Sequence, residues 1–375
     1  MIDQLKQRLH AKHSERVFLD AQRGLIERPR LSSRRVLGYA LSLTILALPF
    51  GFFLLGAWMI LFQSEHLFMI ICGIFALIFA YIIHPRPVRR TAKEFDRTGM
   101  PELFRLMDAI AAEMGVKTPD AFASNYDFHD YATTYGLFKR RTLIGVGMPL
   151  WWLRGDAERI AVLAQQIAHF GNGDPKQDAI VGAAFETTLR WEHILTPPPD
   201  PDFHPGVGDL IAGGIMFVLR LPVRIIGEVL LYLEFGTGQR SVYIADAMAA
   251  RVAGSDAVVS SIHKNAVEPV AVAAINALYP YDRDQNARVF DVMAAAVADL
   301  PDGQRMVLEQ RAKAQVARID QSSAPDGYRI AFVKTLGDVA PKLAPDMFDF
   351  NKIGDELRIE ADRQGRMLMQ RYEIQ

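Results

Sequence analysis

The chain has 375 residues, half of them hydrophobic, and its 42 basic and 43 acidic residues give a net charge of −1. This length is enough for a large core or two modest domains, and the balanced charge leaves no basic face for nucleic acid. The single cysteine, Cys72, lies in an apolar run and excludes both a disulfide framework and a thiolate metal site.

The N-terminal part predicts a membrane anchor. Residues 1–33 are polar and basic, which favours a juxtamembrane helix against anionic headgroups or a simple solvated helix. Two apolar runs follow at about 36–62 and 67–83, joined by a short polar connector. Because about 20 apolar residues cross a bilayer core, we expect a transmembrane helical hairpin over residues 34–85. The first run is too long, and starts too late, for a cleaved signal peptide.

Basic residues flank this hairpin on both sides, whereas its connector has no Lys or Arg. They are Arg28, Arg30, Arg34, Arg35, Arg86, Arg89, Arg90 and Lys93. The positive-inside rule therefore predicts that both ends of the hairpin, and everything after residue 86, are cytoplasmic. These flanks disfavour the alternative, a buried hairpin in a soluble protein. We expect a multi-pass protein of the inner (cytoplasmic) membrane, with the lipid bilayer as a partner.

Residues 86–255 predict a domain of mixed structure. A helix is expected over 101–115, which begins with proline, ends with glycine and has apolar residues at helical spacing. Short strands are expected at 121–124 and 142–148. A second helix is expected from about residue 156 to 170, with glycines near its end.

The later part of the chain predicts more helices. Residues 209–235 are strongly apolar, yet charged residues and a proline interrupt them: Arg220, Pro222, Arg224 and Glu228. Arginine is costly at the middle of a bilayer, so we favour an amphipathic, membrane-surface or core-packed helix pair over a third span. Another helix is expected over 241–254, followed by a helical C-terminal region, 256–375. The expected fold class is mainly α with a small β-sheet (α+β).

The helix over 156–170 carries a degenerate zinc-peptidase motif. In H-E-x-x-H, two histidines on one helical face hold zinc, and the glutamate acts as general base on the metal-bound water. Here Gln165 and Gln166 stand at the first two positions and only His169 remains. A carboxamide is a poor zinc ligand and has no useful basicity near neutral pH. The motif therefore predicts no peptidase chemistry.

The surrounding residues resemble the HtpX-type and CAAX-prenyl-type integral membrane zinc metallopeptidases over about residues 30–335. The hairpin, the Pro-Glu-Leu-type helix, the edge-strand region at 130–132 and the Ala-Val-Leu-Ala-x-x-x-x-His helix occur in the family's order. Asn172 and Asp174 match the tail of the family's H-x-x-N-x-D pattern. The resemblance implies a zincin-like (gluzincin) domain.

The family's remaining chemical residues are replaced. Its third zinc ligand comes from a pattern like R-E-Y-x-A-D, which stands here as Ser-Val-Tyr-Ile-Ala-Asp, with Val242 at the glutamate position and Asp246 retained. Its H-P-x-x-x-R-I segment becomes Ala-Pro-Asp-Gly-Tyr-Arg329-Ile330. Two of three protein ligands and the general base are lost, so the resemblance implies that zinc, the family's cofactor, is lost too.

The resemblance leaves a vestigial cleft and no catalytic or metal-binding residue. Its members are Gln165, Gln166, His169, Val242 and Asp246. In the family, the aspartate orients a ligand histidine. We therefore expect Gln165 or His169 to donate a hydrogen bond to Asp246, and Val242 to replace the lost carboxylate by apolar packing.

The leading hypothesis is a catalytically inactive, membrane-anchored pseudopeptidase that acts as a binding or regulatory module. It would engage membrane-protein segments or an active peptidase. The alternative is an active membrane metalloendopeptidase with a displaced ligand set, for example His129, His169 and His193, whose spacing does not recommend them. A purely structural membrane protein is the third possibility.

Overall fold

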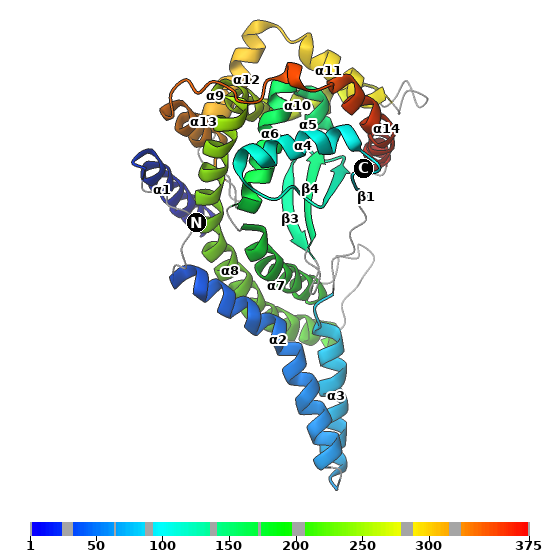
Figure 1. Ribbon diagram of the computed structural model, residues 1–375. Coiled ribbons are helices and arrows are strands. Elements are labelled where there is room, and N and C mark those ends of the chain that lie inside the picture. Colours follow the sequence, from blue (N-terminus) through cyan, green and yellow to red (C-terminus); the bar gives the residue numbers. More distant parts are fainter. Residues whose placement is uncertain are drawn as a thin grey trace. The chain divides into compact units, whose positions relative to one another are not determined.

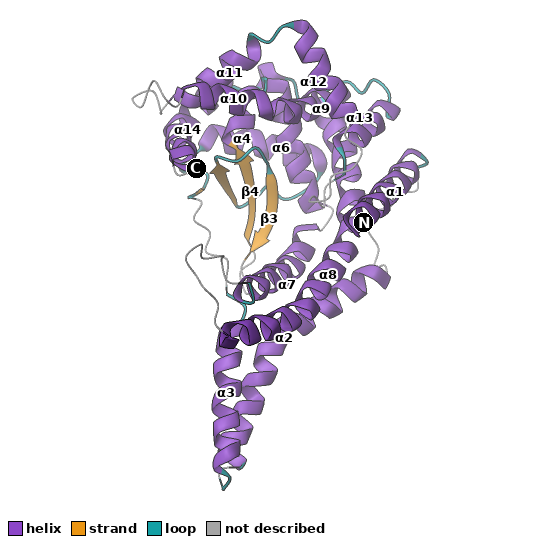
Figure 2. Cartoon of the chain, turned by 180° about the vertical axis from the view of Figure 1, so that it is seen from behind, coloured by secondary structure: helices purple, strands orange, loops and turns teal. Residues whose placement is uncertain are grey.

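The computed structural model describes residues 2–24, 33–63, 65–86, 93–135, 141–171, 174–196, 207–278, 288–314 and 324–373. The chain is mainly helical with one small mixed sheet, which confirms the predicted α+β class (Figure 2). It forms two compact units. Unit 1 comprises residues 1–30, 90–176 and 236–375, and unit 2 comprises residues 31–89 and 177–235.

The sheet of unit 1 has the order β1-β2-β4-β3. Its strands are β1 (Glu94–Phe95), β2 (Ala121–Asn125), β3 (Tyr131–Tyr135) and β4 (Arg141–Gly147). The central pair β2–β4 is parallel, whereas β1 and β3 pair antiparallel at the two edges. Side chains alternate across it: Phe122, Ile144 and Val146 enter the main core, and Ala121, Ala123 and Leu143 form a smaller cluster.

Helices surround that main core. They are α1 (Ile2–Gln22), α4 (Pro101–Met114), α5 (Met148–Leu153), α6 (Asp156–Gly171), the later part of α8 (Val207–Ala253), α9 (Ser255–His263), α10 (Glu268–Leu278), α11 (Val289–Ala298), α12 (Asp302–Ala314), α13 (Asp326–Thr335) and α14 (Phe350–Glu373) (Figure 1). The predicted α4 shows how the sequence specifies them. Pro101 starts it, Leu103, Met107 and Ile110 line its buried face, and Gly115 ends it with a φ of 66°.

The units group the chain differently from the linear succession of segments 1–33, 34–85, 86–255 and 256–375. Helix α1 belongs to unit 1, where Gln239 donates a hydrogen bond to Ser14 and the ring of Phe18 stacks on Tyr328 at 4.7 Å. The helices after residue 256 share one core with α4 and α6. Their apolar faces are buried against the same elements, so the described helices of this region belong to unit 1.

Unit 2 is built from α2 (Ser33–Phe62), α3 (Leu67–Ile83), most of α7 (Asp174–Ile194) and the first part of α8. Helices α2 and α3 pack as a hairpin in which Gly56 and Gly73 face each other. A Cβ on Gly56 would lie 2.7 Å from the carbonyl oxygen of Gly73, so only glycine permits this approach.

One helical segment among the described residues, Arg35–Phe62, is long and apolar enough to cross a membrane. Helix α3 is more apolar than α2, but it has only 17 residues. A helix near the N-terminus with the length and apolar character of a membrane span is therefore present, as predicted.

The apolar region 209–235 is not the pair of helices that was predicted. It belongs to α8, a single helix of 47 residues that contains Pro222 and continues through Asp246. Proline inside a helix removes one backbone hydrogen bond and favours a bend, but it does not oblige the helix to end.

Candidate functional site

Helix α6 presents the degenerate motif from a well-anchored element of unit 1. Ile160, Leu163 and Ile167 are fully buried at helical spacing, which fixes the rotation of the helix about its axis. On the adjoining face, Gln165 is half-buried and Gln166 is buried. His169 lies one turn beyond Gln165 and is half-buried.

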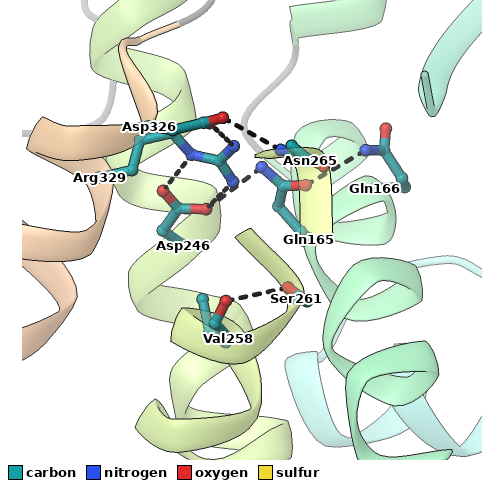
Figure 3. A network of polar contacts seen from close by, with 8 residues as sticks. All are labelled: Gln165, Gln166, Asp246, Val258, Ser261, Asn265, Asp326 and Arg329. Carbon is teal, nitrogen blue, oxygen red and sulfur yellow. Dashed lines mark hydrogen bonds and ion pairs between the residues drawn. The ribbon is translucent and has the colours of Figure 1, made fainter. Parts of the chain in front are cut away.

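Asp246 on α8 is the centre of a buried polar network (Figure 3). Both of its oxygens are bound by Arg329 of α13: Nη2 lies 2.8 Å from Oδ1, and Nε lies 2.9 Å from Oδ2. The Asp246 side chain is fully buried and that of Arg329 is 9% exposed. Two parallel charge-assisted bonds of this kind are the strongest pairing available to a carboxylate among protein side chains.

The network extends to α6 through the two glutamines. Gln165 Nε2 donates to Asp246 Oδ1 at 3.2 Å, and Gln166 Nε2 donates to Gln165 Oε1 at 3.2 Å (Figure 3). The predicted hydrogen bond between the motif helix and Asp246 is therefore confirmed, with Gln165 as the donor. Three helices that are remote in sequence meet at this one carboxylate.

A second carboxylate supports the arginine from the other side. Arg329 Nη1 donates to Asp326 Oδ1 at 3.3 Å, and Asn265 donates to the other oxygen of Asp326 at 3.3 Å (Figure 3). Burial alone would lower the pKa of Arg329. The negative charges of Asp246 and Asp326 outweigh this effect and raise the pKa above its ordinary value. Arg329 is a permanent cation here.

Val242 and Tyr243 occupy the turn of α8 that precedes Asp246. Val242 is 7% exposed and belongs to the main hydrophobic core, so the position of the family's ligand glutamate is apolar. Tyr243 is fully buried and packs edge-on against Phe332 at 5.1 Å. Burial, reinforced by the negative charge of Asp246, raises the pKa of the Tyr243 phenol, which is neutral at all physiological pH values.

The side chains at this site do not provide the ligands that a zinc ion needs. Both oxygens of Asp246 accept hydrogen bonds from Arg329, Gln165 offers a carboxamide and Val242 offers no donor. Across the part of the chain that the structure describes, no three His, Cys, Asp or Glu side chains gather as a metal-binding group. Within that part, the site joins helices through an ion pair and amide hydrogen bonds.

Sequence reasoning did not assign Arg329 a role in the site. The signal was present, because Arg329 is the arginine of the segment that resembles H-P-x-x-x-R-I. Asp326 and Asn265 carried no such signal. The structure brings Gln165, Gln166 and Asp246 together as expected. Of the family's tail, Asn172 lies outside the described residues, as does the side chain of Asp174.

The histidines of the alternative ligand set lie on separate elements. His129 precedes β3, where its ring lies 6.0 Å from that of Tyr131, and His193 is on the part of α7 that belongs to unit 2.

No family model, curated protein or solved structure matches this chain.

Proposed function

We propose that the chain is a catalytically silent, membrane-anchored relative of the HtpX-type and CAAX-prenyl-type zinc metallopeptidases that acts as a binding or regulatory module. Its partners would be membrane-protein segments or an active peptidase. The observation that carries the proposal is the network at Asp246. It joins the motif helix α6 to α8 at the positions that the resemblance assigns to the zinc site, but with an arginine and a carboxamide as partners.

The chemistry of this network supports a protein that has kept the fold of the peptidase family but lost its catalytic activity. A peptidase needs a metal-activated water and a general base, and neither Gln165 nor Gln166 supplies basicity. The buried Arg329–Asp246 pair instead ties α13 to α8. In the same unit, β3 lies at an edge of the sheet, where an extended polypeptide can pair by main-chain hydrogen bonds and be held without being cut.

The natural protein should purify without stoichiometric zinc. After incubation with excess zinc and removal of loosely bound metal, elemental analysis should find far less than one zinc per chain, since His169 is the only family ligand left. About one tightly held zinc per chain would instead favour the alternative, an active metalloendopeptidase that uses a displaced ligand set.

The membrane part of the proposal is a two-span hairpin, α2 and α3, with units 1 and 2 otherwise on the cytoplasmic side. Its support is the apolar character of both helices and the basic residues on both flanks. Reporter fusions after residue 100 should therefore be active only as cytoplasmic reporters. Activity restricted to reporters of the opposite side would contradict this topology.

A further inference from the structure

The first part of α8 exposes apolar side chains in every direction. Ile215, Met216, Phe217, Val218 and Leu219 are consecutive, and each is between 41% and 63% exposed. Successive residues of an α-helix are about 100° apart, so five in a row cover its whole circumference. A docked protein covers one face of a helix, whereas the lipids of a leaflet contact all sides of a helix that is immersed among them. The exposure pattern therefore favours lipid as the occupant.

Contacts within unit 2 also determine how deep residues 215–219 of α8 lie relative to the C-terminal end of α3. At the C-terminal end of α3, Trp191 of α7 donates through Nε1 to the carbonyl oxygen of Ile83 at 2.8 Å. Its neighbour Arg190 donates to the carbonyl oxygens of Ile82 and His84. The apolar run of α3 ends at this point, and tryptophan and arginine are typical of the boundary between hydrocarbon and headgroups.

An ion pair between α7 and α8 places Arg220 at about the same depth in the membrane as the C-terminal end of α3. Arg220 Nη2 lies 2.9 Å from Glu192 Oε1, one residue beyond Trp191. The residues from 215 to 219 lie within five positions of Arg220, so their backbone is at most about 7.5 Å from this level along the helix. Interfacial helices bury their apolar side chains about 5–10 Å into the boundary region. A deeper position would bring Arg224 and Glu228 into the hydrocarbon at high cost.

We propose that residues 212–221 of α8 are immersed in the headgroup–acyl boundary of the leaflet that the C-terminal end of α3 reaches. This second membrane contact rests on the proposed hairpin anchor and extends it. The surface is continuous in character with the hairpin, since Phe75, Ile78 and Tyr81 of α3 are also exposed. The bilayer thereby restrains α8, the helix that carries Asp246.

The test uses the full chain with Cys72 replaced by serine and one new cysteine labelled with a fluorophore. Phe217→Cys reports on α8, and Phe75→Cys reports on the hairpin. Ile359→Cys, at a position 82% exposed on α14 of unit 1, is the control for water. Each variant is placed in phosphatidylcholine–phosphatidylglycerol vesicles with nitroxide groups either near the headgroup or near the end of the acyl chain, or with aqueous iodide.

The label at residue 217 should lose fluorescence mainly to the nitroxide near the headgroup, and the label at residue 359 mainly to iodide. Quenching at 217 by iodide alone, by the deep nitroxide most strongly, or by none of the three would overturn the proposal in favour of water, a third span or a protein cover. The label at residue 75 separates the two proposals. If it too escapes both nitroxides, the hairpin anchor itself fails.

Discussion

Replacing Asp246 by alanine should lower the free energy of unfolding by about 3–5 kcal/mol. The substitution leaves the guanidinium of Arg329 buried without the two bonds that now bind it at 2.8 and 2.9 Å. It also removes the acceptor of Gln165. Because Asp326 still contacts Arg329, we expect the lower half of this range. Thermal and denaturant unfolding of the full chain in detergent measure the loss.

Two further variants distinguish the effect of breaking a buried ion pair from the effect of removing any charged side chain. Lys342→Ala removes a partner of Glu113 from a pair in which the lysine is 60% exposed, and it should cost less than about 1 kcal/mol. The double variant Asp246→Leu with Arg329→Met removes both buried charges and should be more stable than Asp246→Ala alone. Equal losses for Asp246→Ala and Lys342→Ala would show that the buried network stabilises the fold no more than an exposed ion pair does.

The elements whose signals are local were predictable from the sequence. Helix α4 has proline and glycine at its ends, and its apolar spacing leaves one interpretation. Strands β2 and β4 were predicted from short apolar runs. Strand β1 has only two residues, too few for any alternation, and exists through its pairing with β2. The continuity of α8 through Pro222 was missed because one proline weakens a helix without stating where it ends.

The site was predictable as far as the motifs reached. The resemblance located Gln165 and Asp246, which are 81 positions apart, and the structure joins them by a hydrogen bond. The role of Arg329 depends on α13 packing beside α8, and that packing is set by a core whose residues are spread over the whole of unit 1. No local pattern specifies such long-range packing, so the ion pair emerged only from the structure.

Restoring the lost ligands should restore zinc binding. The triple variant Gln165→His, Gln166→Glu and Val242→Glu regenerates the family's three protein ligands and its general base on helices α6 and α8, which already meet at Asp246. Three protein ligands and a water complete a tetrahedral zinc site. The variant that lacks only the Gln165→His change is the matched control, since it keeps the added negative charge but has one ligand fewer.

The most direct measurement is the zinc content of the natural chain, the control and the triple variant, all purified identically. Thermal unfolding of each protein shows that it is folded before its zinc content is compared. A pseudopeptidase that has kept its scaffold predicts about one zinc per chain in the triple variant only. A folded triple variant that holds no more zinc than the natural chain would contradict the kinship, because Gln165, His169 and Val242 would then not converge on one point.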